Sequence, residues 1–196
     1  MYRVLDQIIT LEDVGRAYGI QNMYRDITSD DCMQFEKLLG KLECSAATFV
    51  QMVLSGQDIS LTRAKLADLK KFLVIMMYRS ECRRKQYTEE IFDFATRLSI
   101  EKHMRDNNIN NIQDVWFENL KWFLKTPIGD ILKEVDRANE PGTPSAIMLT
   151  YKGPIHVVEL LDYGHMVFNY VCVWQAQEGS EFIMSDNCFG CFEGDM

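Results

Sequence analysis

The sequence predicts an α+β protein that is mostly helical, with about five helices followed by a small C-terminal β-hairpin or sheet. Apolar residues recur at helical spacing over about 28–138, whereas β-branched and aromatic residues gather in about 146–190. A loop at 139–145, NEPGTPS, separates the two parts. Because 196 residues is a typical length for one domain, we predict a single domain over 1–196.

The first three helices are expected at about 30–55, 62–85 and 88–105. Ser29 precedes the first of them and can accept a hydrogen bond from its unpaired N-terminal amides. Thr88 has the same role at the start of the third helix, where acidic residues follow it and favour the positive end of the helix dipole.

The fourth and fifth helices are expected on either side of a Thr-Pro pair. Asn111 caps the fourth helix, at about 112–125. Thr126 then caps the fifth helix and Pro127 occupies its first position, where the missing amide hydrogen costs nothing.

Short apolar segments follow the loop. AIMLTY at 146–151 indicates a strand, and HVVELLD at 156–162 fits either a strand or a helix. Residues 167–176 and 181–185 flank a turn at 177–180, which predicts a β-hairpin.

Composition and charge narrow the classes of function. The net charge of −8 makes duplex nucleic acid an unexpected partner, because such proteins usually present a basic face. No apolar run approaches the length of a membrane span, and the N-terminus lacks the apolar core of a signal peptide. We therefore expect a cytoplasmic protein without membrane partners.

The six cysteines are too sparse for a disulfide framework. Four of them lie in periodic segments, and we expect them to be small buried side chains: Cys32, Cys44, Cys82 and Cys172. Cys188 and Cys191 form a single CxxC, for which incidental cysteines, a metal site and a redox site are the alternatives. We predict no metal site, and no glycine-rich loop or nucleophile elbow points to a particular cofactor.

Charged residues on the first two helices could meet. Glu36 and Glu43 share one stripe of the first helix, beside its apolar face, and Arg79 borders the apolar face of the second. Because charged side chains are seldom buried alone, we expect Arg79 to pair with one of these carboxylates. A structural salt bridge, a pair inside a functional pocket and fully solvated charges are the three alternatives.

Two further segments carry polar groups suited to a site. Arg25 and Asp26 lie together in a loop, and Asp186 closes the last predicted strand. If the protein is an enzyme, Asp186 and Glu36 are the acid–base candidates and Arg25 and Arg79 hold an anion, with Asp26 and Glu43 as further ligand-binding residues. This arrangement predicts hydrolysis or transfer on a small anionic substrate.

The main alternative is a protein-interaction or regulatory module, and an inactive shortened protein is a third hypothesis. An unpaired edge of the predicted hairpin would favour self-association.

Four segments resemble one protein family when they are taken in order. They are VGRAYGIQNMYRD (14–26), the helix with Glu36 and LeuGluCys (42–44), LADLKKFLVIMMYR (66–79) and WQAQEGSEFIMSDNCFGCFEG (174–194). They are similar to the fungal branch of an uncharacterised family, domain-of-unknown-function family 4238. Members of that family usually begin with a His-Tyr-Val-Pro-Arg-Phe-like segment and continue past the Ser-Asp-Asn block, so the resemblance implies a shortened member and supplies no reaction.

Overall fold

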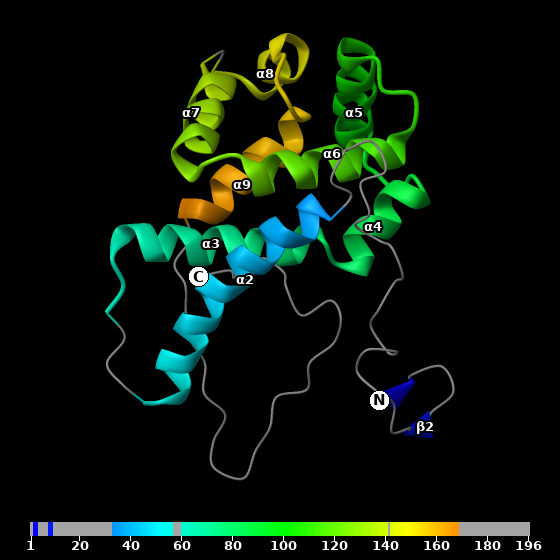
Figure 1. The fold of residues 1–196 in the computed structure, drawn as a ribbon. Coiled ribbons are helices and arrows are strands. Elements are labelled where there is room, and N and C mark those ends of the chain that lie inside the picture. Colours follow the sequence, from blue (N-terminus) through cyan, green and yellow to red (C-terminus); the bar gives the residue numbers. More distant parts are fainter. Residues whose placement is uncertain (1, 4–7, 10–32, 57–59, 141, 169–196) are drawn as a thin grey trace, which may run out of the picture. The chain divides into compact units, whose positions relative to one another are not determined.

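A computed structural model describes residues 2–3, 8–9, 33–56, 60–140 and 142–168 of the chain (Figure 1). The chain divides into two units, residues 1–36 and 37–196. In the first unit, β1 (Tyr2–Arg3) and β2 (Ile8–Ile9) form a short antiparallel pair. Helix α2 (Gln34–Leu54) begins at the end of the first unit and continues into the second.

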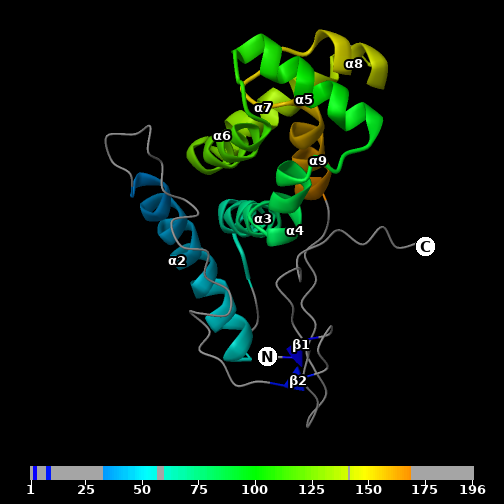
Figure 2. The same ribbon diagram turned by 90° about the vertical axis from the view of Figure 1, so that its right-hand side faces the viewer.

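The second unit is an assembly of helices. After α2 it contains α3 (Arg63–Tyr78), α4 (Glu81–Thr88), α5 (Phe94–Asn107), α6 (Ile112–Lys125), α7 (Ile128–Asn139), α8 (Pro144–Thr150) and α9 (Val157–Phe168). Figure 2 shows α9 among the other helices, and it packs against α3, α5, α7 and α8. The side chains that α9 contributes therefore lie where several helices meet.

The core of this unit consists of apolar side chains contributed by α3, α5, α6, α7, α9 and the segment before α9. The most deeply buried are Ile75, Ile100, Val115, Leu120, Phe123, Ile131, Ile155, Leu160 and Tyr163. Gly164 of α9 allows a close approach to α7, because a Cβ atom there would lie 2.8 Å from a methyl carbon of Val135. Burial of this apolar surface is the main driving force for the packing of the helices.

Local side-chain caps determine where most of these helices begin. Thr62, Ser80, Asp93, Asn111 and Thr143 precede α3, α4, α5, α6 and α8, and each accepts a hydrogen bond from a backbone amide in the first turn. These bonds satisfy amides that have no partner inside the helix. The caps therefore explain why one long predicted helix becomes two.

The predicted helix at 62–85 was wrong in this respect, because Ser80 caps α4 and separates it from α3. The predicted start of the third helix was also wrong. Thr88 ends α4, Glu90 adopts a left-handed backbone with φ of 52°, and Asp93 caps α5. At the next junction, Pro127 and not Thr126 occupies the cap position of α7.

The predicted α+β class is contradicted by the described residues, which contain eight helices where about five were expected. The segment AIMLTY, expected as a strand, lies in α8 except for its last residue, which caps that helix, and all but the first residue of HVVELLD lie in α9. Buried residues 157, 160 and 164 recur at helical spacing, so α9 buries one face among other helices despite its β-branched residues. No C-terminal hairpin is present in the described part, since 169–176 and 181–185 lie outside it and 167–168 end α9.

A buried lysine links α3 to the end of α6. The Lys71 Nζ atom donates hydrogen bonds to the carbonyl oxygens of Leu124, at 3.1 Å, and Thr126, at 2.7 Å. These carbonyls lie at a helix C-terminus, where they lack helical partners and favour a cation. Burial lowers the pKa of Lys71, while the nearby Asp68 opposes that effect.

Two other findings concern the described helices, namely their length and polarity and the exposure of two cysteines. None of the helices in the described ranges is long and apolar enough to cross a membrane.

Of the four cysteines expected to be buried, Cys32 and Cys172 lie outside the described residues. Cys44 and Cys82 are exposed free thiols, so the expectation that they are buried was wrong. Both lie on the outer faces of their helices, which an apolar period alone does not reveal for a short side chain.

Candidate functional site

Only some of the site residues predicted from the sequence lie in the part of the chain that the structure describes. Arg25, Asp26 and Asp186 lie outside the described residues. Glu36 is exposed in the first turn of α2. The expected pair between Arg79 and a carboxylate of the first helix is present, with Arg79 Nη1 2.8 Å from Glu43 Oε1. The Glu43 side chain is 46% exposed, so this pair lies at the surface.

A second ion pair lies much deeper, between α4 and α9. Arg83 Nη2 is 2.5 Å from Glu159 Oε1, and the Glu159 side chain is 1% exposed. A further carboxylate, that of Asp162, lies 3.5 Å from the same nitrogen. A carboxylate this deeply buried requires a charged or hydrogen-bonding partner, and Arg83 supplies both.

Tyr87 connects this ion pair to a buried histidine. Its hydroxyl donates a hydrogen bond to Glu159 Oε1 at 2.7 Å and lies 2.7 Å from His156 Nε2. A phenol has one hydrogen to donate, and Tyr87 donates it to the carboxylate. His156 Nε2 must therefore carry a hydrogen and donate it to the Tyr87 oxygen. In its neutral form His156 therefore has a bare Nδ1, which can act as an acceptor.

The chain of hydrogen bonds continues into α3 and α6. The hydroxyls of Tyr78 and Tyr87 are 3.3 Å apart, and Asn119 Nδ2 donates to the Tyr78 hydroxyl at 3.3 Å. Because the hydrogen of Tyr87 is directed at Glu159, Tyr78 donates to Tyr87. We call Arg83, Glu159, Tyr87, His156, Tyr78 and Asn119 the buried polar network.

Burial determines the protonation of this network. Burial lowers the pKa of His156 to about 4, although the nearby Glu159 acts in the opposite direction. Burial raises the pKa of Tyr87 well above its usual value, and the Glu159 charge raises it further. Burial alone would lower the pKa of Arg83, but the Glu159 carboxylate beside it raises the pKa overall. At neutral pH the network therefore contains one ion pair, neutral tyrosines and a neutral histidine.

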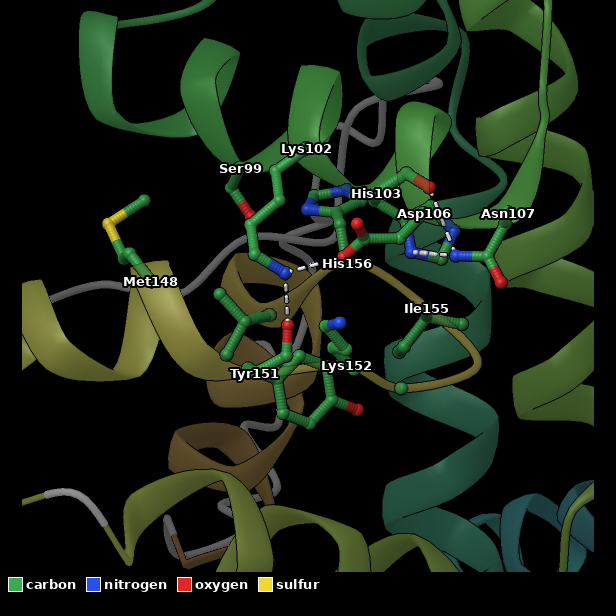
Figure 3. Close-up of a pocket in the computed structure, with 12 residues that line it drawn as sticks. Ser99, Lys102, His103, Asp106, Asn107, Met148, Tyr151, Lys152, Ile155 and His156 are labelled. Carbon is green, nitrogen blue, oxygen red and sulfur yellow. Dashed lines mark hydrogen bonds and ion pairs between the residues drawn. The ribbon is translucent and has the colours of Figure 1, made fainter.

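His156 also lines a small inner pocket between α5 and the segment that connects α8 to α9. The inner pocket has a volume of about 10 Å³ and is lined by Ser99, Lys102, His103, Met148, Tyr151, Ile155 and His156, among others (Figure 3). That volume holds about one water-sized group. The rings of His103 and His156 have centroids 6.3 Å apart. Two buried histidines thus meet at a space for a single small group.

Asn107 sets the protonation pattern of His103. Its Nδ2 donates to His103 Nδ1 at 3.1 Å and to the His103 carbonyl at 3.0 Å, as the dashed lines in Figure 3 show. His103 Nδ1 therefore accepts, and the hydrogen of the neutral ring is on Nε2. Burial lowers the pKa of His103, although Asp106 opposes the shift. Neutral His103 thus offers a donor, its Nε2–H, that has no partner among the residues the structure describes.

Lys102 lines the inner pocket, but its ammonium already has two hydrogen-bond partners. Its ammonium donates to Asp106 Oδ2 at 2.6 Å and to the Tyr151 carbonyl at 2.5 Å (Figure 3). The hydrogen bond from Lys102 lowers the pKa of Asp106. These contacts hold α5 against the segment that precedes α9, and they neutralise the acidic residue in the wall.

A wider surface depression adjoins the inner pocket. This outer depression has a volume of about 350 Å³ and is lined by Asp106, Asn107, Lys152, Gly153 and Pro154. Asp106, Asn107, Lys152 and Gly153 line both spaces. Lys152 is exposed, and its ammonium forms no ion pair within the described part of the chain, although its charge helps to lower the pKa of Asp106. An exposed ammonium therefore lines the outer depression, and the two histidines line the adjoining inner pocket.

The chemistry of this arrangement favours binding over nucleophilic catalysis. Ser99, His103 and Asn107 follow one face of α5 at four-residue spacing. A serine nucleophile would need His103 as a proton acceptor, but the hydrogen bond from Asn107 places the ring hydrogen on Nε2. Within the described ranges, no group of three or more His, Cys, Asp or Glu side chains is arranged to hold a metal ion.

Sequence reasoning missed both histidines and most of the buried polar network. His156 and Glu159 lie in the segment 156–162, which was predicted as either a strand or a helix, and no role in a site was predicted for Arg83. One available signal was the position of Glu159 inside an apolar run, since an acidic residue there needs a partner.

Comparison with family models gives a match to "Protein of unknown function (DUF4238)" over residues 5–194. The chain belongs to this family. The match supports the resemblance noted in the sequence, and it specifies no reaction, ligand or partner. Searches of curated proteins and of solved structures found no match to this member of the family.

Proposed function

We propose that this member of the family binds a small anionic ligand in the outer depression, with one group of the ligand entering the inner pocket. The observation that carries the proposal is an exposed ammonium, that of Lys152, and an unpartnered donor, His103 Nε2–H, in two adjoining spaces that share lining residues. The acidic residue in the same wall, Asp106, is already paired with Lys102. The local field therefore favours a negative ligand.

The proposal keeps the ligand class predicted from the sequence and changes the residues. The predicted anion-binding pair, Arg25 and Arg79, does not contribute to this site, since Arg25 lies outside the described residues and Arg79 pairs with Glu43. A hydrolase or transferase step has less support than binding, because His103 presents a donor at the pocket and burial makes His156 a weak base.

Titration calorimetry with phosphate, sulfate, glycolate and acetate tests this function on the full chain. We expect binding that weakens with added salt, because an exposed charge is screened. Lys152→Ala should weaken binding several-fold, whereas Lys65→Ala, which removes an exposed lysine of α3 outside the site, should leave it unchanged. Absence of binding by all four anions, or equal effects of the two substitutions, would contradict the proposal.

A second candidate function, a protein-interaction module formed by self-association, is favoured by an exposed apolar row at the start of α5. Ile91, Phe94 and Leu98 are 59%, 78% and 46% exposed. Acidic residues, Glu90 among them, precede this row, and Arg105 lies near the other end of α5. Two copies with antiparallel α5 helices would cover the row and place acidic ends beside basic ends.

Sedimentation equilibrium over a range of concentrations tests self-association. The chain should form dimers that Phe94→Lys disrupts, whereas Thr88→Lys, at an exposed position of α4, should not affect them. A monomer at the highest concentration would remove this candidate.

A further inference from the structure

The inner pocket has two walls of opposite hydrogen-bonding character. Neutral His103 presents a donor, because Asn107 occupies its Nδ1 atom. Neutral His156 presents an acceptor, because its Nε2–H is directed at Tyr87. The His156 Nδ1 atom is fully buried and has no hydrogen-bond partner in the described structure.

An unpartnered acceptor inside a protein has a cost in free energy, so a group that donates to it is favoured. His103 and His156 both line the inner pocket, which admits about one water-sized group, and their ring centroids are 6.3 Å apart, so one oxygen atom in the pocket lies near both rings. That oxygen must accept a hydrogen bond from His103 and donate one to His156. A hydroxyl does both, whereas a carboxylate oxygen, a sulfate oxygen and a methyl group do not.

We infer that the site selects anions that carry a hydroxyl, and that the hydroxyl occupies the inner pocket between His103 and His156. This inference rests on the proposed function, because the charge of the ligand is assigned to the depression at Lys152. Two sources supply such a hydroxyl, a hydroxycarboxylate with the hydroxyl on carbon and dihydrogen phosphate with the hydroxyl on phosphorus, and the experiment below distinguishes them. In the absence of ligand, a water molecule is the natural occupant of the same position.

The buried polar network acts here as a positioning device. Tyr87 accepts a hydrogen bond from His156 Nε2–H and donates one to Glu159. Arg83 balances the charge of the Glu159 carboxylate. This order leaves His156 Nδ1 without a hydrogen and able to accept a hydrogen bond. Loss of the network would therefore change which ligand is preferred, in addition to any effect on stability.

Two matched pairs of probes test the selectivity on the full chain. Glycolate and acetate differ by one hydroxyl on carbon. At pH 6 phosphate is mainly dihydrogen phosphate, with two hydroxyls and one negative charge, whereas sulfate has no hydroxyl and two negative charges, so charge alone would favour sulfate. We expect the hydroxylated member of at least one pair to bind about tenfold or more tightly, since the other leaves His156 Nδ1 without a donor. The pair that shows the preference identifies which hydroxyl the site accepts.

His156→Gln tests the role of the acceptor. Glutamine retains a donor that can reach Tyr87 but has no acceptor at the position of Nδ1. The preference for the hydroxylated anion should fall to about twofold or less in this variant. It should persist in His165→Gln, which replaces an exposed histidine of α9 outside the pocket.

Nitrogen-15 NMR of the histidines in the unmodified chain provides a readout that does not depend on a variant folding. Glycolate or phosphate should shift the signals of His156 Nδ1 and His103 Nε2, and acetate and sulfate should not. Equal affinities within both pairs, with binding still weakened by Lys152→Ala, would overturn the selectivity and leave anion binding intact. Absence of binding by all four probes would overturn the proposed function itself.

Discussion

Arg79 and Arg83 lie four residues apart, and each pairs with a glutamate of a distant helix. Arg79 reaches Glu43 of α2, whose side chain is 46% exposed. Arg83 reaches Glu159 of α9, whose side chain is 1% exposed and also accepts a hydrogen bond from Tyr87. The same pair of residue types thus forms a solvated contact in one place and the centre of a buried polar network in the other.

The difference arises at Ser80, which ends α3 and starts α4. On one continuous helix, the two arginines would share a face. The break redirects Arg83 toward α9, where burial makes the loss of a partner far more costly. Exposure to solvent, and not the types of the two residues, therefore determines how much stability is lost when either ion pair is broken.

The largest expected effect is that of Arg83→Met. It leaves the Glu159 carboxylate buried without a cation, and we expect the free energy of unfolding to fall by about 3–5 kcal/mol. Urea denaturation measures the change, with Arg105→Met, an exposed arginine of α5, as a control that should change stability by about 0.5 kcal/mol or less. A loss below about 1 kcal/mol for Arg83→Met would mean that Glu159 is solvated.

The next prediction concerns pH. The pKa of His156 is about 4 in the folded chain and 6.5 when unperturbed, so between these values the unfolded state binds a proton that the folded state does not. The contribution of neutral, buried His156 to stability is therefore fully present above pH 6.5 and is lost as the pH falls toward 4. His103 acts in the same direction, whereas Asp162, whose pKa is raised by burial, partly offsets the loss.

Urea denaturation at pH 7 and pH 4.5 should show a decrease of a few kcal/mol, and His156→Gln should reduce the difference. A stability that is constant or that rises on acidification would contradict the neutral, buried histidine.

A smaller effect is expected for a single hydroxyl of the buried polar network. Tyr87→Phe leaves His156 Nε2–H and Glu159 each short of a partner, so stability should fall by about 1–3 kcal/mol. Tyr163→Phe is a matched control, because the buried Tyr163 hydroxyl has no hydrogen-bond partner in the described structure. Its removal should be neutral or slightly stabilising, and thermal unfolding of both variants should separate the two cases.

The smallest effect is expected for Glu43→Gln, which removes the carboxylate from the surface pair with Arg79. We expect a loss of less than about 1 kcal/mol that shrinks further in high salt, because both charges are partly solvated. Comparing the variant with the unmodified chain at low and high salt checks this. A loss as large as that of Arg83→Met would remove the contrast between the two pairs.

Patterns local in sequence predicted much of the helical part. The fourth helix was expected at 112–125 with Asn111 as its cap, and α6 has these bounds and this cap. The pairing of Arg79 with a glutamate of the first helix was also predicted, because both lie beside apolar stripes. Such inferences succeed because helical period and capping depend on residues within a few positions of one another.

The candidate site depended on contacts that no local pattern contains. Tyr87 and His156 are 69 positions apart and meet because α4 and α9 lie together in the folded chain. The segment 156–162 allowed a strand or a helix until burial among other helices decided between them, since β-branched residues tolerate either.

Sequence alone therefore determined the family of this protein, the ion pair of Arg79 and most of its helix positions. Tertiary structure decided which acid is buried, which histidine nitrogen is bare and where the two histidines meet. Desolvation, which sets the pKa values and the cost of an unpaired group, depends on every helix that surrounds the residue, and so appears only in the folded chain.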